Sequence, residues 1–146
     1  LITDPKKRFQ KKMGFIDFSE LNKYTNEIIE KFNVKTTGVR ALASSLSGGN
    51  LQKFVVGREI GQKPSLFIVN QPTWGVDALS AANIRQAIVD IANTGAAIIL
   101  ISQDLDEILE ISNKVAFLTN GNLSIPTNTT DIKADEIGAI MGGISD

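Results

Sequence analysis

The chain has 146 residues, a length that suits one domain or a large part of one. It is 42% hydrophobic and 21% charged, as globular proteins are, and its formal net charge of −1 gives no support to nucleic-acid binding. The sequence contains neither cysteine nor histidine, which excludes disulfides, cysteine-ligated metal sites and a histidine general base. No apolar run in the sequence approaches the ~20 residues that a membrane-spanning helix needs.

Apolar residues repeated at three- and four-residue steps predict two helices in the first part of the chain. The first is expected from residue 19 or 20 to 32. The second opens at Leu46–Asn50, where Ser47 or Asn50 can cap it, and runs to about Gly61. The stripe expected to face inward comprises Leu51, Phe54, Val55 and Arg58.

The middle of the chain predicts a strand, a helix and a second strand. The first strand is expected at 66–70, the helix from an N-cap at Asp77 to about Asn93, and the second strand at 96–102. Because the sequence AAIILIS at 96–102 is continuously apolar, both faces of that strand should be covered, as in a parallel sheet. The helix residues expected to face inward are Ile84, Ile88 and Ile91.

The last part of the chain predicts shorter elements. A helix is expected at 104–112, strands at 115–118 and 123–125 flank a tight turn at Asn120–Gly121, and a weaker helix is expected at 135–141. Strands and helices alternating at this spacing predict an α/β fold with right-handed crossovers and a mostly parallel sheet.

The most specific motif is SLSGGNLQK at 45–53. Gly48 and Gly49 expose backbone N–H groups at the start of a helix, where the helix dipole adds positive potential and Ser47 adds a hydroxyl donor. This combination predicts a site for a phosphate group. A glycine-rich helix start without a ligand is the alternative, and the motif alone does not separate the two.

A second group of polar residues follows the strand at 66–70. Asn70 and Gln71 stand at the tip of this strand, before a turn that carries Trp74 and Asp77. In nucleotide-hydrolysing α/β proteins, two carboxylates would do chemistry at such a tip. Here both positions carry the corresponding amides.

These motifs, in this order, resemble the ATPase subunits of ABC transporters over roughly residues 14–125. The variants LSGGN, NQPTWGVDA and ISQDLDEI are most similar to importers of simple sugars and nucleosides. The matching segments are LSGGN at 46–50 for the signature loop, LFIVNQ at 66–71 for the Walker B strand, GVD at 75–77 for the D-loop and ISQD at 101–104 for the switch region.

The resemblance implies a P-loop NTPase-like α/β fold and the second, C-terminal half of a subunit with two nucleotide-binding halves. It divides the chain into part of a helical subdomain at 1–50, an α/β core at 51–126 and a C-terminal tail or helix at 127–146. No P-loop pattern, G-x-x-x-x-G-K-[ST], occurs in the sequence. The chain is therefore expected to be an incomplete, truncated segment that begins inside the helical subdomain.

The positions that match the family's catalytic groups are all neutral amides. Asn70 stands for the aspartate that helps hold Mg²⁺, and it brings no charge to that ion. Gln71 stands for the catalytic glutamate; it can position water but cannot take its proton, and losing a general base typically slows a reaction by ~10²–10⁴-fold. Gln103 stands for the switch histidine and can still donate to a γ-phosphate. This half's own site is therefore expected to be degenerate, with Mg²⁺ bound weakly or not at all.

The resemblance also implies how the chain would work. Two halves of the family meet head to tail, and each ATP lies between the P-loop and Walker B strand of one half and the signature loop of the other. This half would serve its partner's ATP, while the chain alone would be inactive. The residues implied at the nucleotide are Ser47, Gly48, Gly49, Asn50 and Gln52, and those implied at the interface of the halves are Trp74 and Asp77.

The partners that the resemblance implies are the N-terminal nucleotide-binding half, membrane permease subunits and, indirectly, a solute-binding protein. The implied location is the cytoplasmic face of the cell membrane. In the family fold, the P-loop strand lies between the strands near Ser102 and Val115. Its absence would expose backbone groups and apolar faces, so the chain alone is expected to self-associate or to rearrange its strands.

Several alternatives remain open at this stage. The chain could be a non-catalytic assembly or regulatory module of ABC ancestry outside transport, or an active ATPase with unusual catalytic groups. Trp74 could stack on a base, and Asp77 could simply cap its helix. The acidic group could hold a metal, although Asp104 and Glu107 also match a capping box. That acidic group comprises Asp104, Asp106, Glu107 and Glu110.

Overall fold

A computed structural model describes residues 9–11 and 14–132 and divides the chain into two compact units, Leu1–Ile101 and Ser102–Asp146. The helix predicted at 135–141 lies outside the described residues. Within the described ranges, no helix is both long enough and apolar enough to cross a bilayer.

The first unit alternates helices and strands as the sequence predicts, and each predicted element begins and ends within about two residues of its expected bounds. Short polar side chains define where the helices start: Asp17, Ser47 and Asp77 each accept a hydrogen bond from a backbone N–H of the following turn. The elements are α1 (Phe18–Lys31), a 3-10 turn η2 (Ala43–Ser45), α2 (Gly48–Ile60), β1 (Leu66–Asn70), α3 (Ala78–Asn93) and β2 (Ala97–Ile101).

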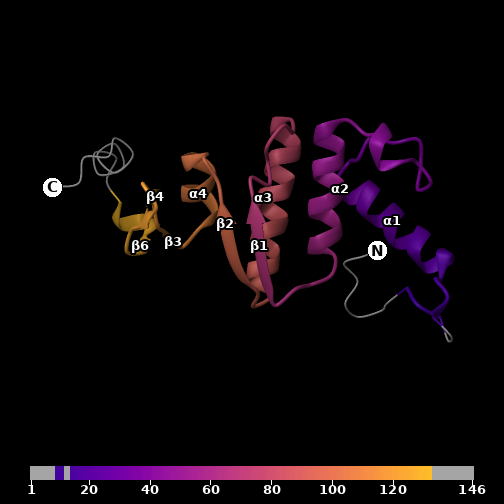
Figure 1. Cartoon of the computed structure of the whole chain (residues 1–146), viewed down its shortest axis with the longest axis horizontal. Helices are drawn as coiled ribbons and strands as arrows, with labels where there is room; N and C mark the ends of the chain where they lie inside the picture. The colour runs from indigo at the N-terminus through magenta and orange to yellow at the C-terminus, as the bar shows by residue number, and fades with distance from the viewer. Residues whose placement is uncertain (1–8, 12–13, 133–146) are drawn as a thin grey trace. The chain divides into compact units, whose positions relative to one another are not determined.

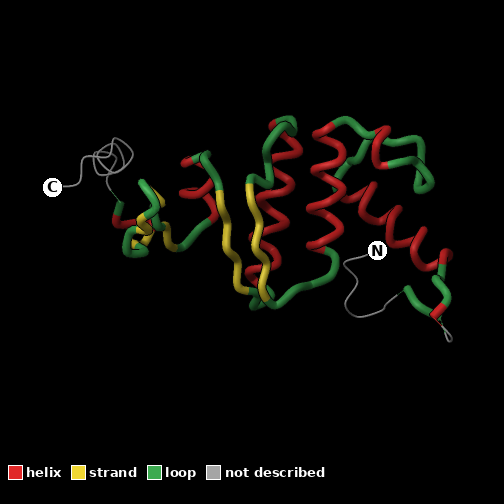
Figure 2. Tube along the Cα trace, in the orientation of Figure 1, coloured by secondary structure: helices red, strands yellow, loops and turns green. Residues whose placement is uncertain are grey.

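The two strands of this unit pair in parallel, with Leu66 opposite Ala97 and Asn70 opposite Ile101. Phe67 and Val69 are buried on one face of the pair. The reason is that α3, which connects β1 to β2, packs on that face of the sheet. Figures 1 and 2 show α3 beside the strands and α2 on its far side.

The opposite face of the sheet is exposed, so the expectation that both faces of the second strand are covered is wrong for this unit. Four large apolar side chains there keep roughly half of their surface in solvent. The reason is that the described helices of the unit stack outward from one side only, as sheet, α3, α2 and α1 (Figure 1). These exposed residues, hereafter the open sheet face, are Leu66, Ile68, Ile99 and Ile101.

The prediction for α3 is confirmed, since Ile84, Ile88 and Ile91 are almost fully buried. The inward stripe predicted for α2 is wrong. Leu51 is exposed, and Phe54, Val55 and Arg58 are only half-buried. The buried residues of α2 are Lys53, Val56, Gly57 and Ile60.

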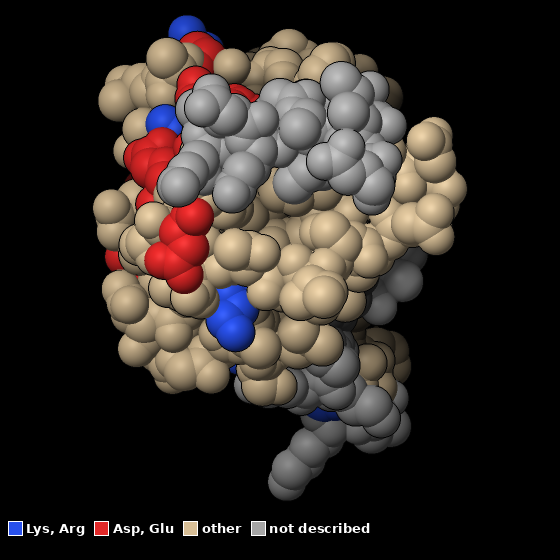
Figure 3. Space-filling view, turned by 90° about the vertical axis from the view of Figure 1, so that its left-hand side faces the viewer, with Lys and Arg blue, Asp and Glu red and all other residues tan. Residues whose placement is uncertain are grey.

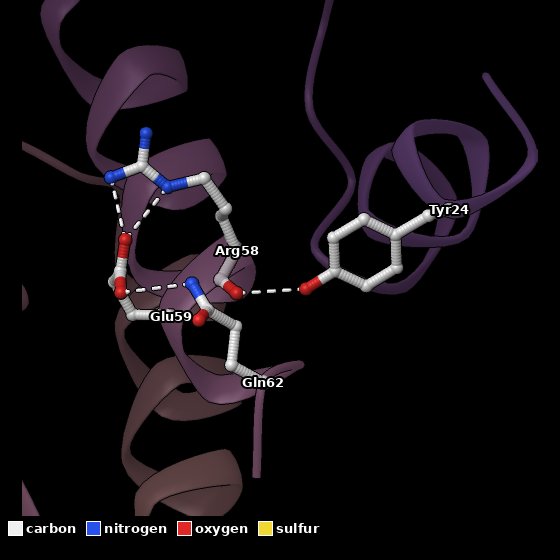
Figure 4. A network of polar contacts seen from close by, with 4 residues as sticks. All are labelled: Tyr24, Arg58, Glu59 and Gln62. Carbon is white, nitrogen blue, oxygen red and sulfur yellow. Dashed lines mark hydrogen bonds and ion pairs between the residues drawn. The ribbon is translucent and has the colours of Figure 1, made fainter. Parts of the chain in front are cut away.

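This shift of the buried face has a physical cause in the packing of α1 on α2. Two glycines one turn apart let aromatic rings lie directly on the α2 backbone: a Cβ at Gly57 would come within 2.5 Å of the Phe32 ring, and one at Gly61 would meet the Tyr24 hydroxyl. The Tyr24 hydroxyl donates to the backbone oxygen of Arg58 at 2.8 Å (Figure 4). Close contact of helices, rather than the apolarity of α2 itself, therefore sets which of its residues are buried.

The last turn of α2 also carries a small polar network, which Figure 4 shows beside Tyr24. The Arg58 guanidinium pairs with the Glu59 carboxylate at 2.6 Å, and the Gln62 amide donates to the other oxygen of Glu59 at 3.2 Å. These groups are partly exposed, so the ion pair is worth little by itself.

The second unit is built from short elements. The predicted turn is confirmed: β4 (Leu118–Thr119) and β5 (Asn122–Leu123) pair antiparallel around Asn120 and Gly121, which both have positive φ. The single strand predicted at 115–118 is instead divided between β3 and β4, and β3 (Lys114–Val115) pairs with β6 (Thr127–Asn128), a strand that the sequence did not indicate. The remaining elements are α4 (Leu105–Ile111) and η3 (Thr129–Asp131).

The fold class is confirmed as α/β. The described parallel pairing is confined to β1 and β2, and the other two strand pairs of the described residues are antiparallel. The division predicted at residues 50 and 126 stays a prediction.

The glycine contact between α1 and α2 generates a stability prediction. Gly57→Ala should lower the free energy of unfolding by about 1–3 kcal/mol, the usual cost of overpacking, although alanine is the better helix former. Urea unfolding followed by circular dichroism measures the change.

The matched control is Gly48→Ala in the same helix, because a Cβ there has no neighbour within 4 Å. A Gly57→Ala variant as stable as the wild type would contradict the packing described for Phe32.

Candidate functional site

The predicted phosphate-binding motif lies at the exposed start of α2. Ser47 is the N-cap, and its Oγ accepts from the side-chain amide of Asn50 at 2.8 Å and, more weakly, from the Asn50 backbone N–H at 3.5 Å. Ser47 and Gly48 are exposed, while Gly49 is half-buried. The open backbone N–H groups of this turn and the positive end of the helix dipole therefore face solvent.

Asn50 fixes the loop that precedes this helix start. Its side-chain oxygen accepts from the backbone N–H of Lys35 at 2.8 Å, while its amide nitrogen donates to Ser47. Both the oxygen and the nitrogen of the Asn50 amide are thus hydrogen-bonded within the protein, and these bonds stabilise the loop.

Gly49 faces the turn that follows β1. A Cβ on Gly49 would lie 2.6 Å from the backbone oxygen of Gly75, so only glycine fits while the two backbones keep this approach. Gly48 has no such neighbour. The adjacent glycines therefore differ: Gly49 is required by packing, and Gly48 leaves the surface open.

Gln52 joins the same two segments through hydrogen bonds. Its side-chain amide nitrogen donates to the backbone oxygens of Gln71 and Pro72, both at 3.1 Å. The sequence placed Gln52 among the residues at the nucleotide, whereas the structure shows its amide directed to the backbone of the turn. The structure thus brings together the start of α2 and residues 70–77, two regions that the sequence selected separately.

Asn70 and Gln71, the two amide residues at the end of β1, are adjacent in the chain but differ in backbone conformation. Asn70 ends the strand and is exposed. Gln71 has φ +50°, and its N–H donates to the Ile101 oxygen at 2.8 Å, which extends the β1–β2 ladder by one residue. Trp74 in the following turn is 71% exposed, so its ring is available to a partner.

Asp77 caps α3, as one of its two predicted roles requires. Its carboxylate accepts from the Ser80 hydroxyl at 2.7 Å and from the Ser80 N–H at 3.0 Å. These bonds, the hydroxyl first, hold the pKa of Asp77 below its ordinary value of 3.8, and the positive charge of Lys53 acts in the same direction.

Lys53 is a buried cation that the sequence did not single out. Its side chain is 5% exposed, and its Nζ donates to the Asn33 oxygen at 2.9 Å just beyond the end of α1. This bond ties the left-handed residue Asn33, with φ +47°, to α2. The sequence carried one signal for this contact, namely that Lys53 lies on the face of the helix that the structure shows to be buried.

Gln103 lies in the second unit, directly before the N-cap of α4. Asp104 accepts from the Glu107 N–H at 3.1 Å, so the predicted cap is present; its own N–H donates to the Ser102 hydroxyl at 3.0 Å. Glu107 is 1% exposed. Among the described residues, no group of three or more carboxylates is placed so that it could hold a metal ion. In the face shown in Figure 3, acidic side chains gather along one margin of a mostly uncharged surface.

Three curated relatives share sequence with most of the chain, although no family model matches it. The nucleoside import ATP-binding protein NupA of Lactococcus lactis is 37% identical over 132 residues, which are 90% of this chain and 26% of that protein. The glucose import ATP-binding protein TsgD13 of Haloferax volcanii is 38% identical over 135 residues, 90% of this chain and 24% of that protein. The galactose/methyl galactoside import ATP-binding protein MglA of Escherichia coli is 35% identical over 126 residues, 85% of this chain and 25% of that protein.

Solved structures decide the fold. A dimeric ATP-binding cassette in a post-hydrolysis state, bound to ADP and Pi, superposes with a TM-score of 0.69 over 80% of this chain and 50% of that one at 19% identity. An ATP-binding subunit of an ABC transporter gives 0.67 over 87% of this chain and 50% of that one, also at 19% identity. The fold is that of an ATP-binding cassette. The chain is similar in sequence to proteins named as sugar and nucleoside import ATP-binding proteins, and it spans about a quarter of their length.

In this cassette fold, the contacts of Gln52, Gly49 and Lys53 are the features that sequence reasoning missed. All three residues lie in or beside the motif that the sequence selected, but their partners are backbone atoms far along the chain. A local pattern carries no information on such partners.

The cap of α3 in the cassette predicts a pH dependence of stability. Because the pKa of Asp77 is lower in the folded than in the unfolded chain, its ionised form stabilises the fold above pH 3.8, and that contribution is lost as pH falls through the depressed pKa. Wild type should therefore be more stable than Asp77→Asn at pH 7, and the difference should shrink below pH 3.8.

Urea unfolding of both proteins between pH 7 and pH 3 checks this expectation. Asp90→Asn, on an exposed residue of the same helix whose carboxylate accepts from Gln86, is the matched control. A difference between wild type and Asp77→Asn that grows on acidification would contradict the assignment.

Proposed function

We propose that the chain is part of the ATP-binding component of an ABC importer for simple sugars or nucleosides. The observation that carries this proposal is the 35–38% identity, over 85–90% of the chain, to proteins named for import of nucleosides, glucose and galactosides. The component couples ATP binding and hydrolysis to transport, with ATP and Mg²⁺ as cofactors.

Within that component, the chain supplies its signature segment to the ATP of a partner half. The exposed helix start at Gly48, capped by Ser47, supports this role because its backbone N–H groups suit a phosphate and no side chain lies within 4 Å of a Cβ at Gly48. The chemistry at this half's own strand tip is different. Asn70 and Gln71 offer amide oxygens and N–H groups but no negative charge to Mg²⁺ and no base for water.

A hydrolytic site needs a P-loop lysine, and the 146 residues contain no P-loop pattern. We assign the lysine at the ATP that this chain's signature segment contacts to the partner half, the N-terminal nucleotide-binding half. Membrane permease subunits and, indirectly, a solute-binding protein complete the assembly at the cytoplasmic face of the membrane. The exposed Trp74 and the Asp77 turn are assigned to the interface between the halves.

Two other functions make different demands. A regulatory or assembly module of ABC ancestry would need no permease, so a neighbouring gene for a multi-span permease favours the importer. The second alternative is an active ATPase that uses amides as its catalytic groups. If the double variant Asn70→Asp, Gln71→Glu restores ATP turnover, and does so only in a protein that includes a P-loop, that result counts against this alternative.

The proposed division of labour predicts unequal effects of two substitutions in the intact importer. Ser47→Arg should abolish ATP hydrolysis, because a long cation then occupies the start of α2. Gln71→Ala should leave most of it, because no base is lost. Phosphate release by the purified transporter is the measurement.

Ser65→Arg is the matched control, since Ser65 is exposed at the opposite end of β1. Equal losses from Ser47→Arg and Gln71→Ala would refute the division of labour.

The open sheet face carries a further proposal, that the isolated chain self-associates. The sequence of β2 has no charged residue to discourage pairing of its outer edge, and apolar side chains project beside it. The weight-average mass in sedimentation equilibrium should rise with concentration, and Ile68→Lys with Ile99→Lys should reduce that rise.

Leu123→Lys is the matched control, because Leu123 is 67% exposed but lies on the β4–β5 hairpin. A concentration-independent monomer mass for the wild type would contradict self-association.

A further inference from the structure

The turn after β1 is held to α2 at two points one helical turn apart. Gly49 meets the backbone oxygen of Gly75, and Gln52 donates to the backbone oxygens of Gln71 and Pro72. Residues three apart lie on the same face of a helix, so these two contacts press one face of the first turns of α2 against one turn of the chain.

The residue at the centre of this arrangement has a strained backbone. Gln71 has φ +50°, a left-handed conformation that is unfavourable for a residue with a side chain unless its surroundings hold it. Its N–H donates to Ile101, and its oxygen accepts from the Trp74 N–H at 3.2 Å and from the Gln52 amide at 3.1 Å. Of these three bonds, only the one from Gln52 comes from a side chain.

Gln52 also satisfies the Pro72 oxygen. Pro72 is almost fully buried, and its carbonyl accepts from the same amide nitrogen of Gln52 at 3.1 Å. A buried carbonyl that loses its hydrogen-bond donor is destabilising, so this contact favours the observed conformation of the turn.

We propose that Gln52 is a positioning residue that fixes the Gln71–Gly75 turn to the start of α2. The N–H groups at the start of α2 and the amide of Gln71 then move together as one rigid piece. A ligand that binds the helix start therefore also fixes the position of the turn. The meaning of this link for transport rests on the proposed function, but the link itself does not depend on nucleotide.

The lone tryptophan of the sequence reports on this turn directly. Trp74 is exposed, and its N–H is bonded to the Gln71 oxygen that Gln52 also holds. The experiment therefore measures amide hydrogen exchange of Trp74 by NMR and the local component of its fluorescence anisotropy decay, in the chain without nucleotide.

Three substitutions separate a donor role from simple packing. Gln52→Ala removes the donor, and exchange at Trp74 should accelerate by about tenfold as the turn loosens. Gln52→Glu keeps the shape but at neutral pH only accepts hydrogen bonds, so it should loosen the turn as much. Gln52→Lys keeps donors for both carbonyls and should retain wild-type exchange and anisotropy.

Gln86→Ala is the matched control, because the Gln86 amide donates to Asp90 on the outer side of α3. Exchange of the buried Ile84 and Ile88 amides should stay unchanged in every variant, which shows that only the turn has opened.

The inference is overturned if Gln52→Glu matches the wild type or if Gln52→Lys matches Gln52→Ala, because packing alone then holds the turn. Since no nucleotide is present, neither result bears on the importer function. Conversely, an importer in which Ser47→Arg has no effect would leave this result standing.

Discussion

The site depends on the close approach of two backbones. The start of α2 and the turn after β1 meet where a Cβ on Gly49 would stand 2.6 Å from the Gly75 oxygen. Any side chain at this position would push the start of α2 away from the end of β1. The hydrogen bonds that Gln52 donates to the backbone of the turn would then be broken. The absence of a Cβ at Gly49 thus permits the juxtaposition of the first turn of α2 with the amides at the end of β1.

That juxtaposition gives the site an uneven chemical character. The start of α2 offers positive potential and exposed donors, whereas the end of β1 offers neutral amides in place of anions. In the proposed function, this surface supplies donors for a phosphate but no base. That combination suits a role in assembling a catalytic centre more than a role in the proton transfer itself.

The sequence predicted the parts of this fold that depend on local chemistry. Asp77 and Asp104 were predicted as helix caps, and Ser47 as one of two candidates with Asn50, because a cap acts within one turn of its own residue. The turn at Asn120–Gly121 was predicted because asparagine and glycine adopt positive φ more readily than other residues. The sequence-based prediction was wrong where contacts with distant elements determine which residues are buried. The buried face of α2 shifted to Val56 and Gly57 because α1 and α3 press on that helix from different directions.

The backbone partners of Gln52 were missed for a similar reason, while its predicted place at the nucleotide stays a prediction. An amide in the signature segment fits either a ligand or a distant backbone carbonyl, and spacing along the chain does not distinguish them. The open sheet face was also missed, since a continuously apolar strand predicts cover on both sides without saying which element provides it.

The parallel register of β1 and β2 has a consequence for how the first unit folds. Leu66 can meet Ala97 only after the chain has turned back through the whole of α3. The entropy of closing that loop must be overcome before any ladder bond forms, so a helix that forms early shortens the search. The Asp77 cap needs only its own first turn, so it favours early formation of the helix that the parallel pairing of β1 and β2 must wait for.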